Sequence, residues 1–278
     1  MTRPAAVGAW ALAGLAIALA QSDPVSRAIV LAGAWLLLVR RRVPDRSLRP
    51  LAIGLAVIAG TTVAVNGLLA HTGATVLAVV PSWVPLVGGI LTVEGFLAGG
   101  GIALGLAGAV SVVAALSVVL DPSDLVDALP GPLHRTAAAV GAALNLVPAT
   151  AESFTAVRDA QRLRGWRPKG PSAVVDLVVP VLLGAIERSV QLAESMEARA
   201  FGSGRRTTAF GSDRSAASAA VGLSALAALV LVVIIRASGS AGSWYAYPTP
   251  SSPSISVVVL APAVLLALAG LLLPEGTT

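Results

Sequence analysis

The sequence of 278 residues has no cysteine, only two histidines and few charged side chains. Without cysteine, disulfides, cysteine-ligated metals and thiol nucleophiles are excluded. The phosphate-binding pattern Gly-x-x-x-x-Gly-Lys-Ser/Thr and the zinc pattern His-Glu-x-x-His are also absent from the sequence. Charged residues form 12% and hydrophobic residues 56% of the chain, whereas a soluble domain carries about 25% charged residues. An ordinary soluble domain is therefore excluded.

Long stretches without any formal charge are present instead. No Asp, Glu, Lys or Arg lies between Arg49 and Glu94, Glu94 and Asp121, Arg214 and Arg236, or Arg236 and Glu275. Such windows hold the roughly 20 apolar residues that a membrane-spanning helix needs. The predicted fold class is an all-α integral membrane protein with about six transmembrane helices and long cytoplasmic amphipathic helices. The expected spans are residues 5–20, 28–39, 51–69, 92–120, 215–235 and 255–273. The second of these is short for a span, so we expect it to include neighbours on its Val25 side.

The basic residues predict the orientation in the membrane. The segment 40–49 holds five arginines and one aspartate, and such loops face the cytoplasm. With both termini and 121–213 also inside, only Arg27 and Arg236 of the nineteen Lys and Arg residues lie outside. Residues 70–91 contain prolines and glycines, which predicts an extracellular hairpin or a partly re-entrant segment. We expect a multi-pass protein of the inner (plasma) membrane.

Three parts of the chain follow from this pattern. Residues 1–120 form an N-terminal group of about four spans, and residues 214–278 form two further spans. The fourth span is rich in glycine, a composition that lets membrane helices approach closely. Residues 121–213 form a cytoplasmic module, which begins at a predicted helix start near Asp121 and a short helix over 125–129.

The first long helix of this module is predicted over about 133–164, with a kink at Pro148. Val157, Ala160 and Arg164 share one face at helical spacing. Arg164 therefore lies at the end of an apolar stripe, between Leu163 and Gly165. Gly165 is expected to end the helix as its C-cap glycine.

The second long helix is predicted from about Ser172 to Ala200. Leu192, Met196 and Arg199 share a face, and Gly202 follows shortly after. Ala198, Arg199 and Ala200 thus repeat the arrangement of the first helix, an arginine between small or apolar residues at a helix end.

Each arginine alone has ordinary explanations. A basic residue in the last turn complements the helix dipole, and juxtamembrane arginines bind anionic lipid head groups. The repetition on two amphipathic helices favours a different role, insertion into grooves on a soluble cytoplasmic partner. A guanidinium offers a planar fork of donors for carboxylates or carbonyl groups in such a groove.

The segments Gln161–Gly165 and Met196–Gly202 carry a resemblance to a known family. Two X-Arg-X signatures of this kind end the coupling helices of the transmembrane T component (EcfT, CbiQ-like family) of energy-coupling factor (ECF) transporters, which are ABC-type vitamin and metal importers. Further segments that resemble the family's are Asp23–Arg27, Asn66–Leu68, Thr92–Gly95, Asp121–Leu125 and Leu146–Pro148. The sequence departs from the family at Leu163, where alanine is usual, and at Ala200, where glycine is usual.

The resemblance implies an energy-coupling protein that is not itself an enzyme. Its partners would be two cytoplasmic ABC ATPase subunits, a substrate-binding membrane S component and the lipid bilayer, with no nucleic acid. ATP would be bound by the ATPases, and this chain would hold no cofactor or metal. The resemblance assigns the ATPase-binding motifs to Leu163, Arg164, Gly165, Ala198, Arg199 and Ala200, with Pro148, Val157, Ala160, Leu192 and Met196 in support.

Other classes of membrane protein fit less well. The permease subunit of another ABC-type transporter would also have cytoplasmic coupling helices, so it stays as the alternative. An ion-coupled transporter places ionisable residues at mid-membrane depth, and the predicted spans contain none. An intramembrane enzyme would gather acid, base or metal-binding residues, whereas His71 and His134 fall on opposite sides of the predicted membrane.

Overall fold

The computed structural model describes residues 3–81, 83, 88–120, 134–166, 172–199, 216–239, 244–253 and 256–273. The chain forms two compact units, one made of Met1–Asp121 with Ser212–Thr278 and the other of Pro122–Gly211. The first unit therefore unites the first and last parts of the sequence. The short helix expected over 125–129 lies outside the described residues.

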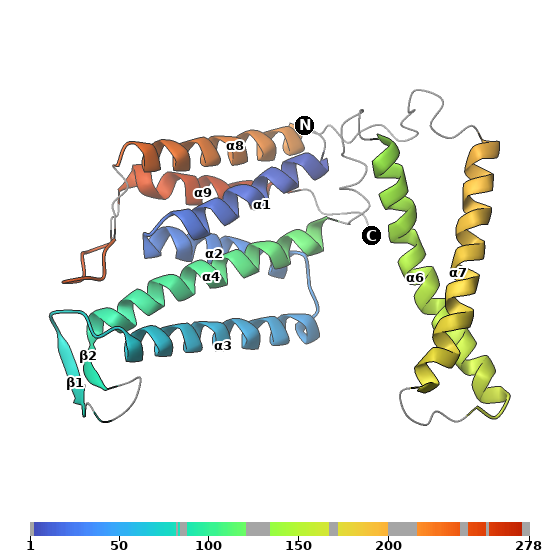
Figure 1. The fold of residues 1–278 in the computed structure, drawn as a ribbon. Coiled ribbons are helices and arrows are strands. Elements are labelled where there is room, and N and C mark those ends of the chain that lie inside the picture. The colour runs from blue at the N-terminus through green and yellow to red at the C-terminus, as the bar shows by residue number, and fades with distance from the viewer. Residues whose placement is uncertain are drawn as a thin grey trace. The chain divides into compact units, whose positions relative to one another are not determined.

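The first unit is a bundle of apolar helices (Figure 1). Its helices are α1 (Arg3–Ala20), α2 (Pro24–Arg40), α3 (Asp45–Leu69), α4 (Val93–Val119), α8 (Ala216–Ala237) and α9 (Val257–Leu271). Every predicted span coincides with one of them. Among the described residues, three helices (α3, α4 and α8) are long and apolar enough to cross a membrane, and two apolar helices, Pro4–Ala20 and Val257–Leu271, are shorter. The chain is an all-α membrane protein in class.

Helix α2 begins at Pro24, so the second span includes residues on the Val25 side of the apolar run 28–39, as expected. Asp23 is its N-cap and accepts a hydrogen bond from the Ser26 N–H at 2.9 Å, while Pro24 occupies the first turn. Both residues favour a helix start. Arg27, which precedes the apolar run, consequently lies inside α2, and its guanidinium donates to the Gly101 carbonyl of α4 at 2.6 Å.

The predicted hairpin is confirmed and consists of two short antiparallel strands, β1 (Val76–Val80) and β2 (Gly89–Thr92). It is the only sheet among the described residues. Thr92 ends β2 and caps α4 by accepting from the Gly95 N–H. Glu94 is fully buried and its Oε1 accepts from the Thr75 N–H at 2.9 Å. The hairpin is thereby attached to the start of α4.

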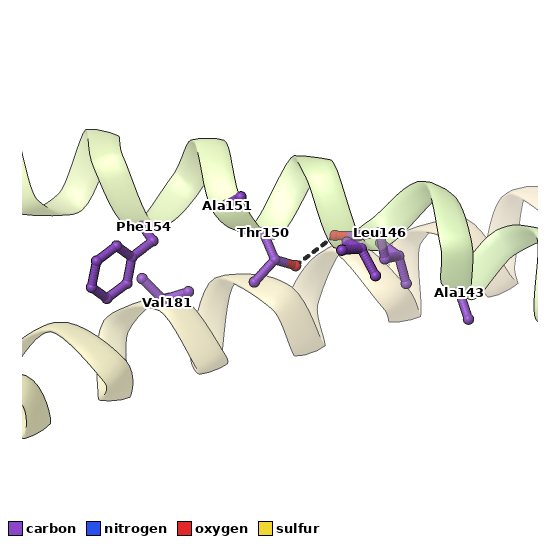
Figure 2. A pocket seen from close by; sticks show the side chains of 7 residues that line it. Ala143, Leu146, Thr150, Ala151, Phe154 and Val181 are labelled. Carbon is purple, nitrogen blue, oxygen red and sulfur yellow. Dashed lines mark hydrogen bonds between the residues drawn. The ribbon is translucent and has the colours of Figure 1, made fainter. Parts of the chain in front are cut away.

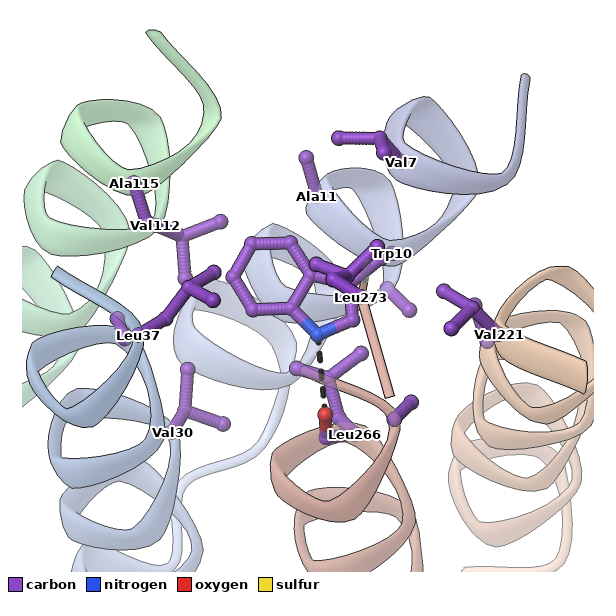
Figure 3. Packing of buried hydrophobic residues seen from close by; sticks show 14 of the residues in the cluster. Val7, Trp10, Ala11, Val30, Leu37, Val112, Ala115, Val221, Leu266 and Leu273 are labelled. Carbon is purple, nitrogen blue, oxygen red and sulfur yellow. Dashed lines mark hydrogen bonds between the residues drawn. The ribbon is translucent and has the colours of Figure 1, made fainter. Parts of the chain in front are cut away.

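The core of this unit surrounds α1, which packs against α2, α4, α8 and α9. Trp10 of α1 is 1% exposed, and its indole N–H donates to the Leu266 carbonyl of α9 at 3.0 Å (Figure 3). Val112 of α4 and Val221 of α8 pack in the same buried cluster. One aromatic ring with a satisfied N–H thus joins helices from both ends of the chain.

Helix α4 packs closely against its neighbours because of its glycines. A Cβ at Gly99 would lie 2.9 Å from the Val63 Cα of α3, and one at Gly105 would lie 2.8 Å from the Ala18 carbonyl oxygen of α1. Both distances are too short for any side chain. As the composition of the fourth span indicated, small residues allow close helix contacts.

Candidate functional site

The second unit contains two long helices, α6 (His134–Leu163) and α7 (Ser172–Ala198), which cross each other (Figure 1). Their bounds agree with the two predicted long helices of the cytoplasmic module. Where they meet, an open pocket of about 370 Å³ is lined by residues of α6 and by Val181 of α7 (Figure 2). Phe154 of α6 and Val181 of α7 face each other there, and Val181 is 7% exposed. The pair is therefore joined by apolar side chains over a limited length.

A polar contact lies beside this apolar junction. Arg188 of α7 donates from Nη1 to the Ser153 hydroxyl of α6 at 2.5 Å and to the Ala149 carbonyl at 3.4 Å. Its Nε donates to the Gly184 carbonyl within α7 at 3.0 Å. The Ser153 hydroxyl also donates to Ala149 at 2.8 Å. We call the hydrogen bond between Arg188 and Ser153 the crossing contact.

The crossing contact could not be recognised in the sequence. Arg188 lies among the charged residues of an amphipathic helix, and Ser153 is one small polar residue on α6. Neither residue belongs to a local motif, because their pairing depends on the tertiary crossing of the two helices. Both are partly buried, which sets them apart from the exposed Glu187 beside Arg188.

The first helix end consists of Leu163, Arg164 and Gly165. Gly165 has a φ of 82°, and its N–H bonds to the Arg162 carbonyl at 3.0 Å. The Trp166 N–H bonds to the Gln161 carbonyl, also at 3.0 Å. This pair of bonds is the Schellman motif that closes a helix at glycine. The predicted C-cap role of Gly165 is confirmed.

Both large side chains at this helix end face solvent within their unit. Leu163 is 90% exposed, and Arg164 is also exposed. The indole N–H of Trp166 donates to Asp176 Oδ2 of α7 at 3.1 Å. This bond joins the residue after the first helix end to the second turn of α7. Neither Trp166 nor Asp176 was singled out from the sequence.

The second helix end consists of Ala198 and Arg199, both exposed. The Arg199 N–H bonds to the Ser195 carbonyl at 3.3 Å, so the helical pattern extends to this residue. Ala200 and Gly202, the remaining parts of the predicted motif, lie outside the described residues.

The two arginines lie symmetrically about the crossing contact along their helices. Arg164 follows Ser153 by eleven residues, and Arg199 follows Arg188 by eleven residues. At 1.5 Å per residue, each helix extends about 16 Å beyond the contact. Because α6 and α7 run in opposite senses through the crossing, the first and second helix ends lie at opposite ends of the pair (Figure 1).

The predicted supporting residues differ in their surroundings. Val157, Leu192 and Met196 are partly buried, as expected of an apolar stripe, whereas Ala160 is exposed. Pro148 is exposed and lies inside α6, in the turn that precedes the crossing contact. Among the described residues, no group of three or more His, Asp or Glu side chains could hold a metal ion.

A comparison with models of protein families shows which family the chain belongs to. A family model described as CbiQ, cobalt transport protein, matches residues 4–209. The chain belongs to the CbiQ family. The CbiQ match runs from α1 to beyond α7, so it includes both candidate arginines, and it ends before α8. The family resemblance inferred from the short motifs is thus confirmed, and the chain is a membrane component of a transport system. None of the curated proteins matches the chain.

Proposed function

We propose that this CbiQ-family protein is the energy-coupling T component of an ECF-type importer. It would link ATP hydrolysis by two cytoplasmic ABC ATPases to uptake of a vitamin or transition-metal ion through a membrane-embedded S component. The observation that carries this proposal is the crossed pair α6–α7, which presents Arg164 and Arg199 at exposed helix ends equally far from the crossing contact.

The two helix ends suit insertion into a partner. Each arginine lies at the end of its helix beside a small residue, Arg164 before Gly165 and Arg199 after Ala198. A helix end is narrower than a helix face, so it fits a groove, and the guanidinium can bind carboxylate or carbonyl oxygens inside. Each ATPase subunit would receive one helix end.

The crossing contact suits the transmission of movement. When ATP binding and release change the separation of the ATPases, the helix ends would be displaced with them. Two helices joined over a short length respond to such a displacement by changing their mutual angle, because packed helices behave as rigid elements that slide or rotate. The α6–α7 pair would carry this change to the S component.

The apolar faces of α6 and α7 support a partner of membrane character. Val147 is 66% exposed on α6, and Leu183 and Ile186 are 63% and 60% exposed on α7. Exposed apolar side chains at this density on a paired helix mark an interaction surface. We assign this surface to the S component, which would determine the substrate.

ATP binding is assigned to the partners. The sequence lacks a phosphate-binding loop, so this chain would be neither an enzyme nor a nucleotide-binding protein. The five arginines of segment 40–49 favour a cytoplasmic position for that segment. Two spans, α3 and α4, lie between it and α6 in the sequence, so α6–α7 would lie on the same side of the inner (plasma) membrane.

Co-purification with ATPase subunits tests the proposal. The tagged protein is compared with the double variant Arg164→Ala/Arg199→Ala, and the matched control is Arg158→Ala/Arg162→Ala, which also removes two arginines from this unit. We expect the control to retain the ATPases and the first variant to lose most of them, because a buried charged contact contributes about 2–5 kcal/mol. Equal retention by both variants would overturn the assignment of the helix ends. If no ATPase binds to the unaltered protein, the T-component proposal itself fails.

A further inference from the structure

An apolar groove runs between α2 and α3 in the first unit. Both helices pack against α4, which forms the floor of a cavity of about 440 Å³. Every residue described in its lining is apolar, among them Leu31 and Trp35 from α2, Ala56 and Val63 from α3, and Gly100 and Ala103 from α4. A groove of this composition in a membrane protein takes a hydrocarbon chain or an apolar helix.

The length of the groove matches one leaflet of a bilayer. Its lining on α3 extends from Ala52 to Val63, which corresponds to about 16 Å of helix. The hydrocarbon core of a bilayer is about 30 Å thick. The groove is therefore about half as long as the core is thick, which is the length that a single acyl chain occupies.

Arginines gather at one end of the groove. Residues 40–49, which we call the arginine turn, comprise the last residue of α2, the connection 41–44 and the first residues of α3, the two helices that form the groove walls. Arg42, Arg46 and Arg49 of this turn are exposed. Arg49 precedes Ala52 of the groove by three residues, which is less than one helical turn. A phosphate bound by this turn would lie directly above the groove.

Arg42 occupies an unusual backbone conformation in this turn. Its φ is 52°, and it closes α2 through bonds from its own N–H to Val39 and from the Val43 N–H to Leu38. Glycine is the residue that adopts this position without steric cost. The chain instead places a cationic side chain there, next to the other arginines.

From these features we propose that the groove and the arginine turn together bind one anionic phospholipid. The phosphate of its head group would bind the arginines, and one acyl chain would lie against Trp35 and Gly100. A partner helix could fill the groove, but it would leave the arginine turn unexplained, whereas one lipid molecule accounts for both parts. This inference is independent of the proposed coupling function.

Native mass spectrometry of the purified full-length protein tests the inference. The probes are dioleoyl phosphatidylglycerol and dioleoyl phosphatidylcholine, which share acyl chains and differ in net charge. We expect at least fivefold greater retention of phosphatidylglycerol. Equal retention of the two lipids would overturn the proposal.

Two glycine variants test the acyl-chain part. A Cβ at Gly100 meets nothing within 4 Å, and the same is true of Gly60, which lies on α3 but does not line the groove. Gly100→Leu should therefore fill the groove and reduce phosphatidylglycerol retention severalfold, while Gly60→Leu leaves it unchanged. An equal effect of both variants, or of neither, would contradict the proposed position of the chain.

Variants of the arginine turn test the head-group part without altering the groove. Arg46→Gln/Arg49→Gln should reduce the preference for phosphatidylglycerol to below twofold, and Arg46→Lys/Arg49→Lys should retain most of it. Arg158→Gln/Arg162→Gln in the second unit serves as the charge-matched control. If the control loses the preference to the same extent, the binding is a general effect of net charge and the site is refuted.

Trp35 supplies a second measurement that does not depend on mass spectrometry. Phosphatidylglycerol with brominated acyl chains should quench the fluorescence of the unaltered protein, and Trp35→Phe should remove a distinct part of this quenching. Loss of a partner membrane protein from Gly100→Leu, with lipid binding and quenching unchanged, would show that a protein occupies the groove and would overturn the proposal.

Discussion

Arg188 of α7 donates a hydrogen bond to the Ser153 hydroxyl of α6 at 2.5 Å, and this contact precedes both candidate arginines by eleven residues along their helices. A cation and a hydroxyl thus connect the two helices near their apolar junction. If the α6–α7 pair transmits movement, the crossing contact determines how the displacement of one helix end reaches the other helix.

Arg188→Met and Ser153→Ala should separate partner binding from transport. Each removes the crossing contact, which contributes about 1.5–3 kcal/mol as a hydrogen bond from a charged group, and leaves Arg164 and Arg199 in place. We expect ATPase retention within twofold of the unaltered protein and a transport rate at least fivefold lower. The double variant should transport no worse than Arg188→Met, since both substitutions remove one interaction. Unchanged transport by either single variant would contradict a role in transmission.

Gly165→Ala should weaken the first helix end. The φ of 82° at this position disfavours a side chain by about 1 kcal/mol, although a Cβ there meets no other atom. We expect a severalfold loss of ATPase affinity, with Gly165→Asn closer to the unaltered protein because asparagine tolerates this conformation. Gly184→Ala in α7 is the control, since its Cβ also meets nothing within 4 Å. If Gly165→Ala and Gly184→Ala bind the ATPases with equal affinity, the geometry of the first helix end does not determine ATPase binding.

Gly105→Ala and Gly100→Ala should have opposite effects on stability. A Cβ at Gly105 would lie 2.8 Å from the Ala18 carbonyl oxygen and 3.1 Å from Arg27 Nε, and overpacking of this kind costs about 1–3 kcal/mol. Gly100 has free space, so alanine there gains up to about 1 kcal/mol in helix propensity. Thermal unfolding in detergent measures both. A lower melting temperature for Gly100→Ala than for Gly105→Ala would refute the described packing of α4.

Arg27→Met should destabilise the helix bundle. The bond from Arg27 to the Gly101 carbonyl joins α2 to α4, and its loss costs about 1.5–3 kcal/mol because the donor is charged. The melting temperature in detergent should fall, whereas Arg46→Met, at an exposed position, should change it little. Similar melting temperatures for the two variants would show that the contact with Gly101 contributes nothing.

Local sequence signals predicted the helices and their ends because these depend on neighbouring residues. Charge-free windows marked the spans, and the glycine after Arg164 marked the Schellman motif. The apolar run 28–39 was too short for a span by itself, and α2 includes the expected neighbours on its Val25 side. Arg27 therefore lies inside α2, where it finds its partner on α4. Of the six expected spans, three correspond to helices that are, in the part of the chain that the structure describes, both long and apolar enough to cross a membrane.

Contacts between distant residues could not be predicted in the same way. Trp10 with Leu266, Trp166 with Asp176 and Arg188 with Ser153 each pair a side chain with a partner on another helix. Their formation depends on how the helices pack, and no spacing within one helix encodes it. The groove between α2 and α3 likewise arises only because both helices pack against α4.

Site-directed cross-linking tests the central claim most directly, because the chain has no cysteine of its own. A single cysteine at Leu163 or Ala198, beside each candidate arginine, is treated with a short thiol-to-amine cross-linker in the assembled complex. A cysteine at Val79, which is 74% exposed in β1, serves as the control. The account predicts that Leu163→Cys and Ala198→Cys each cross-link to an ATPase subunit and that Val79→Cys does not. Efficient labelling of both helix ends without any cross-link to an ATPase would contradict the account.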